Sequence, residues 1–159
     1  MTDQPHRPFP TGWSVRAASA ADAEQLHELE MAARAAITDV RGGAAALAEQ
    51  PAVGEWHALL ADPAEHVVVA AIDDVVVGYL QVAHTRGTPA GVVRQVYVEP
   101  EARELGFGDE LLAAAIDWLR ERGARVVESW ALPGDRDTKN LFERAGVTAR
   151  KLVVSKRLD

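Results

Sequence analysis

The chain has 159 residues, of which 48% are hydrophobic, and it carries a formal net charge of −7 and no cysteine. This length suits one domain with a substantial core, and the lack of cysteine excludes disulfides, thiolate metal ligands and a cysteine nucleophile. The acidic balance argues against nucleic-acid binding. No apolar run reaches the roughly 18 residues of a membrane helix, and the first residues lack the apolar block of a secretory signal. We therefore predict one cytoplasmic domain that binds neither nucleic acid nor membranes.

The first part of the chain predicts a tail, a strand and a pair of helical regions. Residues 1–12 hold three prolines and no hydrophobic period, which is typical of a flexible tail ahead of a single domain over residues 13–159. Residues 13–16 favour a short strand. Ser19 then starts a capping box before a helix over about residues 20–36. A second helical region, over residues 44–61, is interrupted by Pro51 and Gly54.

The middle of the chain predicts strands. Residues 66–72 and 75–82 are β-branched runs separated by two aspartates, which indicates an antiparallel hairpin. After a loop, residues 92–98 favour a further strand that stops at Glu99-Pro100, where proline removes a hydrogen-bond donor. A helix with one apolar face begins near Gly108.

The last part predicts two strands and a helix. Gly123 suits the end of the preceding helix, and residues 125–132 favour a strand. Asp135 or Asp137 can cap a short helix that runs through Ala145. Residues 148–158 alternate enough to predict the last strand.

The joint from Arg103 to Gly108 carries the chemical signal. Its two glycines bring backbone N–H groups to the start of a helix without side-chain obstruction, and such a helix end attracts anions such as phosphate. A dinucleotide-binding fingerprint would need glycine where Leu111 stands, and no Gly-Lys-Ser/Thr of a Walker A loop occurs. On spacing alone, an ordinary strand-to-helix connection remains an alternative.

Other chemistries lack their motifs. None of the five histidines has metal-ligand spacing, so we expect no metal. None of the serines stands in a G-x-S-x-G setting, which argues against a serine hydrolase.

The pattern Arg/Gln-x-x-Gly-x-Gly/Ala is matched by Arg103, Gly106 and Gly108, and a strand and a proline precede it. In these features the chain resembles the GNAT superfamily of N-acetyltransferases. The resemblance covers nearly the whole chain and implies an α/β (α+β) fold. It predicts a single domain with a central mixed, mostly antiparallel sheet flanked by about four helices.

The resemblance implies direct transfer of an acetyl group from acetyl-CoA to a primary amine within a ternary complex. The acceptor would be a small molecule or a peptide, and we also expect a homodimer. Carried over by position, the acetyl-CoA-binding residues would be Val96, Tyr97, Val98, Arg103, Glu104, Leu105, Gly106, Phe107, Gly108 and Asn140.

Three positions depart from the family pattern. Phe142 stands where many relatives have a tyrosine acid, Arg94 where many have a glutamate base, and Glu104 where glycine is common. The candidate catalytic residues are therefore Tyr97 and Glu99, and Glu30 or a bound water also remains open as the base. The departures leave a second hypothesis, a catalytically weak acyl-CoA-binding module that serves as a sensor or partner-binding domain.

The acceptor side would be formed by the first two helical regions, which the resemblance places near the substrate with Glu28, Glu30, Asp39 and Trp56. Residues 1–62 hold nine Asp/Glu against four Lys/Arg. This excess indicates either a solvated acidic surface or a rim that attracts a cationic amine.

Overall fold

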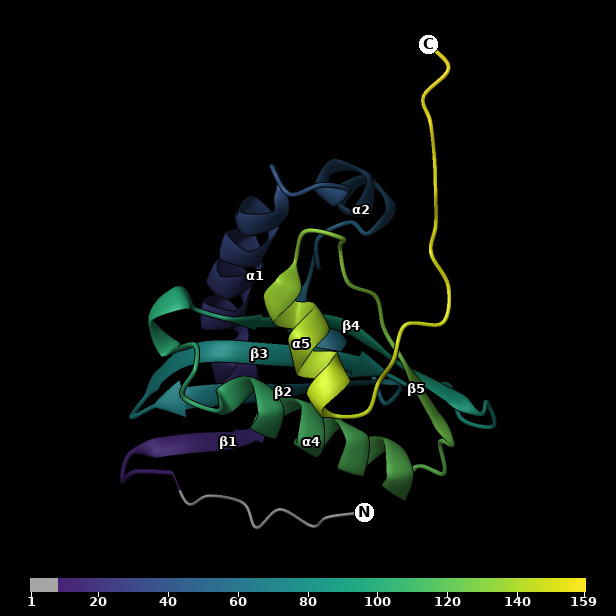
Figure 1. The fold of residues 1–159 in the computed structure, drawn as a ribbon. Helices are drawn as coiled ribbons and strands as arrows, with labels where there is room; N and C mark the ends of the chain where they lie inside the picture. The colour runs from purple at the N-terminus through teal and green to yellow at the C-terminus, as the bar shows by residue number, and fades with distance from the viewer. Residues whose placement is uncertain (1–8) are drawn as a thin grey trace.

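Five strands form the central sheet of the computed structural model, which describes residues 9–159 (Figure 1). They are β1 (Trp13–Ala17), β2 (Glu65–Ile72), β3 (Val75–Ala83), β4 (Ala90–Val98) and β5 (Val126–Glu128), and they lie in that order across the sheet. Neighbours pair antiparallel except β4 and β5, which are parallel. The predicted mixed, mostly antiparallel sheet is confirmed, and most of the predicted tail lies outside the described residues.

Helices cover both faces of the sheet (Figure 1). They are α1 (Ala23–Ile37), α2 (Gly43–Glu49), α3 (Trp56–Ala61), α4 (Phe107–Glu121) and α5 (Arg136–Arg144), with short 3₁₀ turns η1 (Ala20–Asp22) and η2 (Pro100–Ala102). One hydrophobic cluster lies on each face of the sheet. The first lies beneath α1 and α3, and the second lies beneath α4 and α5. The predicted break in the second helical region is confirmed, since α2 and α3 are separate helices.

The α4 face holds the larger core. Leu111, Leu112 and Ala115 recur at helical spacing and are almost completely buried against the sheet. Phe107 opens the helix, and its ring packs 5.3 Å from that of Trp13. Each fully buried leucine of this kind contributes roughly 1.5–3 kcal/mol relative to exposure. This packing fixes the N-terminus of α4 against the sheet.

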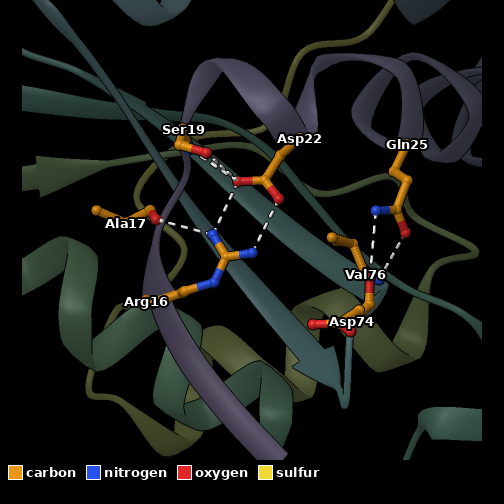
Figure 2. A network of polar contacts seen from close by, with 7 residues as sticks. All are labelled: Arg16, Ala17, Ser19, Asp22, Gln25, Asp74 and Val76. Atoms are coloured by element: carbon orange, nitrogen blue, oxygen red, sulfur yellow. Dashed lines mark hydrogen bonds and ion pairs between the residues drawn. The ribbon is translucent and has the colours of Figure 1, made fainter.

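The start of the first helix is held by a charged pair (Figure 2). Arg16 on β1 donates through both terminal nitrogens to Asp22, at 2.8 Å each, and the Ser19 backbone N–H donates to the same carboxylate at 2.7 Å. These contacts confirm the predicted capping box at Ser19, which begins the 3₁₀ turn η1, while α1 itself begins at Ala23. The hydrogen bonds from Arg16 lower the pKa of the Asp22 carboxyl to about 2.

A β-bulge at Arg94 interrupts β4. Gln81 on β3 pairs with Gln95, but the next residue, Val82, pairs with Val93, so Arg94 is the extra residue. Side chains of a regular strand alternate between the two faces of the sheet. The extra residue therefore places every later side chain of β4 on the face opposite to the one that simple alternation would give it. Val93 is buried on the α4 side, and beyond the bulge Val96 joins it on that side.

Two predicted strands are corrected by the structure. The strand expected over residues 125–132 spans only Val126–Glu128, and residues 148–158 have no regular secondary structure. An extended segment becomes a strand only when its backbone groups find partners. Residues 148–159 instead leave the domain after α5 and extend away from the sheet (Figure 1). In the described part of the chain, no helix has the length and apolar character needed to cross a membrane.

Candidate active site

A cleft opens where β4 and β5 separate. The two strands pair only from Ala90 to Val92 on β4, after which Ser129 bonds through its hydroxyl to the Val93 carbonyl at 3.0 Å and the chain diverges. The edge of β4 that faces β5 therefore has no strand beside it from Arg94 to Val98. The cleft has a volume of about 1090 Å³ and is lined by β4, by residues 129–131 just after β5, and by α1, α2, α4 and α5.

The N-terminus of α4 lies at one end of this cleft. Gly106 precedes the helix with a φ of 93°, a left-handed conformation that favours glycine, and no side chain caps the helix there. A Cβ placed on Gly106 would meet nothing within 4 Å, so the backbone opens directly onto free space. The unpaired N–H groups of this first turn can bind an anion.

Arg103 ties the loop to β4. Its Nε donates to the Val98 carbonyl at 2.9 Å, and its guanidinium carbon lies 5.8 Å from the centroid of the Tyr97 ring. One terminal nitrogen also lies 3.6 Å from Asp137 on α5. The guanidinium is thereby held beside the N-terminus of α4. Burial raises the pKa of the Tyr97 phenol.

Helix α5 closes the same side of the cleft. Asp135 caps the helix by accepting from the Thr138 backbone N–H at 3.1 Å and from the Thr138 hydroxyl at 2.6 Å. Asn140 is exposed and lines the cleft. Phe142, by contrast, is buried in the core beneath α4 and α5, so its ring does not substitute for a cleft-lining acid.

The opposite wall comes from α1 and α2. Arg34 donates to the carbonyls of Gln50 at 2.8 Å and Leu47 at 3.3 Å, which ties the two helices together. The wall residues from this pair are Ala33, Arg34, Ala36, Ile37, Val40, Ala46, Leu47 and Gln50. Apart from Arg34 and Gln50 this wall is apolar, and it contributes no carboxylate.

A polar network lies behind the cleft floor. Gln95 lines the cleft, and its Nε2 donates to Oε1 of Glu30 at 3.3 Å while its Oε1 accepts from the Tyr79 hydroxyl at 2.5 Å. Glu30 is completely buried, and its Oε1 also accepts from the Val53 backbone N–H at 2.8 Å. Its Oε2 is buried without a partner among the described residues. Burial strongly raises the pKa of Tyr79.

A second, partly buried carboxylate, that of Glu65, continues this network. Gln81 donates to Glu65 at 3.0 Å, and Arg94 lies 3.4 Å from the same carboxylate. Sequence reasoning missed Tyr79, Gln81 and Gln95 as site residues. The available signal was polar side chains at alternate positions of otherwise apolar strands.

The structure brings most of the predicted acetyl-CoA-binding residues together. Those that line the cleft are Val96, Tyr97, Val98, Arg103, Glu104, Gly106, Phe107, Gly108 and Asn140. Leu105 and Glu99 do not line it. Glu28 and Asp39 are exposed off the cleft, whereas Trp56 is buried with its ring edge against Tyr79. Glu30 lies behind the floor, so the four predicted acceptor residues do not form a rim.

The model of the acetyltransferase (GNAT) family matches residues 24–147. The chain belongs to this family of acyltransferase enzymes. A mycothiol acetyltransferase of Sanguibacter keddieii is 36% identical over 135 residues, which cover 84% of this chain and 39% of that protein. An uncharacterized N-acetyltransferase of Methanocaldococcus jannaschii is 28% identical over 61 residues, 38% of this chain and 27% of that protein. The chain thus spans well under half the length of either relative.

Solved structures share this GNAT fold. The aminoglycoside N-acetyltransferase AAC(6')-Iy, in complex with CoA, has a TM-score of 0.69 at 19% identity, covering 95% of this chain and 97% of that one. An aminoglycoside acetyltransferase from an uncultured soil metagenomic sample, meta-AAC0020, has a TM-score of 0.70 at 18% identity, covering 93% and 96%. At these identities the likeness shows the fold, which confirms the predicted GNAT architecture.

Proposed function

We propose that this GNAT domain transfers the acetyl group of acetyl-CoA to the primary amine of a small molecule. The observation that carries the proposal is the meeting of two features in one cleft. The edge of β4 is free from Arg94 to Val98, and the uncapped N-terminus of α4 lies beyond the end of that strand. An extended amide-bearing arm can pair with a strand edge, and a pyrophosphate suits a helix N-terminus.

The residues present fit the donor. Backbone groups of Val96 and Val98 would bind the pantetheine arm, while Arg103 and the first turn from Gly106 would hold the pyrophosphate. The thioester supplies an activated acetyl group, and binding both substrates in one cleft makes the attack effectively intramolecular. Without a cysteine in the chain, a thiol-bound acyl-enzyme has no nucleophile.

The acceptor would enter against the wall formed by α1 and α2. The relative from Sanguibacter is named for acetylation of mycothiol, and AAC(6')-Iy has been solved with a bisubstrate analogue of CoA and acetylneamine. Both names refer to small molecules, which supports a small-molecule acceptor here. The apolar wall around Ile37 and Leu47 would pack against the body of that molecule.

An amine is mostly protonated near neutral pH, so the reaction needs a proton acceptor. Of the groups considered from the sequence, Glu99 does not line the cleft. Glu30 is buried one side chain behind the cleft, in contact with Gln95, and its Oε2 has no partner in the described chain. We propose that Glu30 receives the proton from the acceptor amine through a water beside Gln95.

The leaving thiolate needs no acid from the protein. A thiol has a pKa of about 8.5, whereas burial raises the pKa of Tyr97 above the ordinary tyrosine value of 10.0. Proton transfer from Tyr97 to the thiolate is therefore uphill, and Tyr97 serves by packing in the cleft. The reaction therefore needs no acid at position 142, and Phe142 can be buried in the core.

Release of free CoA thiol from acetyl-CoA, measured across a panel of primary amines, tests the proposal. We expect at least one small amine to accelerate the release, and mass spectrometry to find that amine heavier by one acetyl group. Tight calorimetric binding of acetyl-CoA without turnover for any amine would instead support the acyl-CoA-binding module. Absence of CoA binding would contradict both hypotheses.

A further inference from the structure

The acceptor wall of the cleft contains an arginine that has no counter-ion in the described part of the chain. Arg34 on α1 is half-buried and lines the cleft. Its hydrogen bonds go to the backbone carbonyls of Gln50 and Leu47, one from each terminal nitrogen. These bonds use two of the five N–H groups of a guanidinium, so three remain for another partner. A cation partly withdrawn from water is stabilised by an anion, and here that anion must come from a bound molecule.

The other arginines that line the cleft differ from Arg34. Three of them already lie beside a carboxylate: Arg94 at 3.4 Å from Glu65, Arg103 at 3.6 Å from Asp137 and Arg144 at 3.0 Å from Asp109. The fourth, Arg136, is exposed, so water solvates its charge. Among the cleft residues described, Arg34 alone is both half-buried and without a neighbouring carboxylate.

The charge of the acceptor wall is therefore positive. Four carboxylates line the cleft, all from the loop before α4, from α4 or from the start of α5: Glu104, Asp109, Asp135 and Asp137. The wall from α1 and α2 contributes Arg34 and no carboxylate. A wall of this kind attracts an anionic group and repels a second cation on the same molecule.

Arg34 also lies next to the group proposed to receive the proton. Glu30 and Arg34 are four residues apart on α1, so they share one face of the helix with their Cβ atoms about 6 Å apart. Burial raises the pKa of Tyr79 and the nearby charge of Arg34 opposes that effect, which places Arg34 close to the Tyr79 hydroxyl. That hydroxyl donates to Gln95, which contacts Glu30. A small molecule can therefore reach both Arg34 and Gln95 at once.

We propose that the acceptor is a small amino carboxylate, whose carboxylate binds Arg34 while its amine faces Gln95. The proposal rests on the proposed acetyl transfer and adds to it the chemical class of the acceptor. A guanidinium can hold a carboxylate through two parallel N–H···O bonds, which fixes the orientation of the bound molecule. An apolar side chain on that molecule would pack against Ile37 and Leu47.

The transfer step is balanced with this acceptor. The ammonium gives one proton to Glu30 through water, and its nitrogen then bonds to the acetyl carbon. The carbon–sulfur bond breaks, CoA leaves as the thiolate, and the second proton of the nitrogen passes to water. The carboxylate stays on Arg34 throughout and takes no part in the bond changes.

Matched acceptors test the carboxylate. Several apolar L-amino acids are each compared with their own amide and with a diamine, and release of CoA thiol is measured. We expect kcat/KM to be at least about tenfold higher for the acid than for its amide. The carboxylate of the free acid favours the protonated amine, which works against this result, so a preference for the acid must come from the protein. Amides or diamines that react as well as the acids would overturn the amino carboxylate and leave the acetyltransferase intact.

Arg34→Gln locates the preference. The ratio of kcat/KM between acid and amide should fall to about one, with the KM for acetyl-CoA unchanged within about twofold. Because Arg34 also ties α1 to α2, a purely structural loss would lower both rates together and leave the ratio as it was. Arg41→Gln removes an exposed cation between α1 and α2 that does not line the cleft, and it should keep the wild-type ratio. A wild-type ratio in Arg34→Gln would refute the assignment.

Binding separates this site from acetyl transfer itself. With CoA bound, calorimetry should detect binding of an N-acetylated apolar amino acid, and Arg34→Gln should weaken that binding by at least about tenfold. If no amine is acetylated but this Arg34-dependent binding is present, the proposed transfer fails and the carboxylate site stands. If the enzyme acetylates other amines but neither binds nor acetylates any amino carboxylate, the carboxylate site is refuted and the transfer stands. Absence of both activity and binding refutes both.

Discussion

The Gln95 side chain lies between a buried carboxylate and the cleft, with its Nε2 3.3 Å from Oε1 of Glu30. Replacing Glu30 by glutamine keeps the shape and an oxygen for the Val53 N–H but removes the proton acceptor. We expect Glu30→Gln to lower kcat/KM by about a hundredfold or more near neutral pH. Steady-state rates with the best amine measure the effect.

Glu99→Gln is the matched control for that experiment, because Glu99 does not line the cleft. It should change kcat/KM by less than about threefold. A Glu30→Gln enzyme with a normal kcat/KM, or one that merely loses thermal stability, would assign Glu30 to structure alone.

Gly108 provides a test of the donor site. A Cβ there would lie 3.4 Å from Leu141, an ordinary contact, so the helix tolerates a side chain. The methyl groups of Gly108→Val would nevertheless crowd the first turn of α4, and we expect calorimetry to show CoA binding weakened by at least about tenfold. Gly54→Val, at a glycine with open space and off the cleft, should bind CoA normally. Equal affinity in both variants would remove the first turn of α4 from the donor site.

Tyr97→Phe tests the leaving-group argument. Because the raised pKa of Tyr97 makes it a poor acid for a thiolate, the variant should retain kcat within about threefold. Pre-steady-state or steady-state rates with the best amine decide the matter. A loss of about a hundredfold would make Tyr97 the acid despite its pKa.

Glu28 tests the acidic-rim hypothesis. Since Glu28 lies off the cleft and the α1 and α2 wall has no carboxylate, the charge reversal Glu28→Lys should leave the acceptor KM within about twofold at saturating acetyl-CoA. An increase of about fivefold or more at low salt would restore the rim and its preference for cationic amines.

The pair of Arg16 and Asp22 sets a pH dependence of stability. The pKa of Asp22 falls from 3.8 to about 2 on folding, so the pair stabilises the fold above pH 4 and this contribution is lost as pH falls toward 2. Allowing for the half-exposed Arg16, Asp22→Asn should lower the free energy of unfolding by roughly 1–2 kcal/mol at pH 7. Chemical denaturation at several pH values measures the difference.

In that series, Asp117→Asn, which breaks an exposed ion pair with Arg120, should cost less than about 0.5 kcal/mol at any pH. The difference between wild type and Asp22→Asn should shrink as pH falls through 2 and approach zero below it. A difference that stays constant from pH 7 to pH 2 would show that Asp22 acts through packing rather than charge.

Local pattern was sufficient to predict most of the elements. The apolar spacing of α4, the hairpin of β2 and β3 and the break at Pro51 and Gly54 all depend on residues near one another in sequence. The strands beyond residue 125 depend on partners instead. β5 stops at Glu128 because the chain leaves β4 there, and residues 148–158 have a strand pattern but no strand beside them.

The candidate site also has one part that local sequence could predict and one part that depends on contacts between distant elements. The loop from Arg103 to Gly108 is contiguous, so its glycine spacing could be recognised directly. The network of Glu30, Gln95 and Tyr79 joins three elements, and no local pattern indicates which face of α1 meets the sheet. Trp56 was expected near the acceptor because the local sequence does not indicate which side of its helix meets the sheet. Its side chain instead packs into the core.

The bulge at Arg94 makes β4 tolerant of a length change at one position. Arg94 is the extra residue, so its deletion would leave Val93 opposite Val82 and Gln95 opposite Gln81, and the later side chains would keep their faces. An extra residue inserted after Val96 would instead turn Tyr97 toward the apolar core under α4. A functional library should therefore retain the deletion of Arg94 and lose single-residue insertions after Val96.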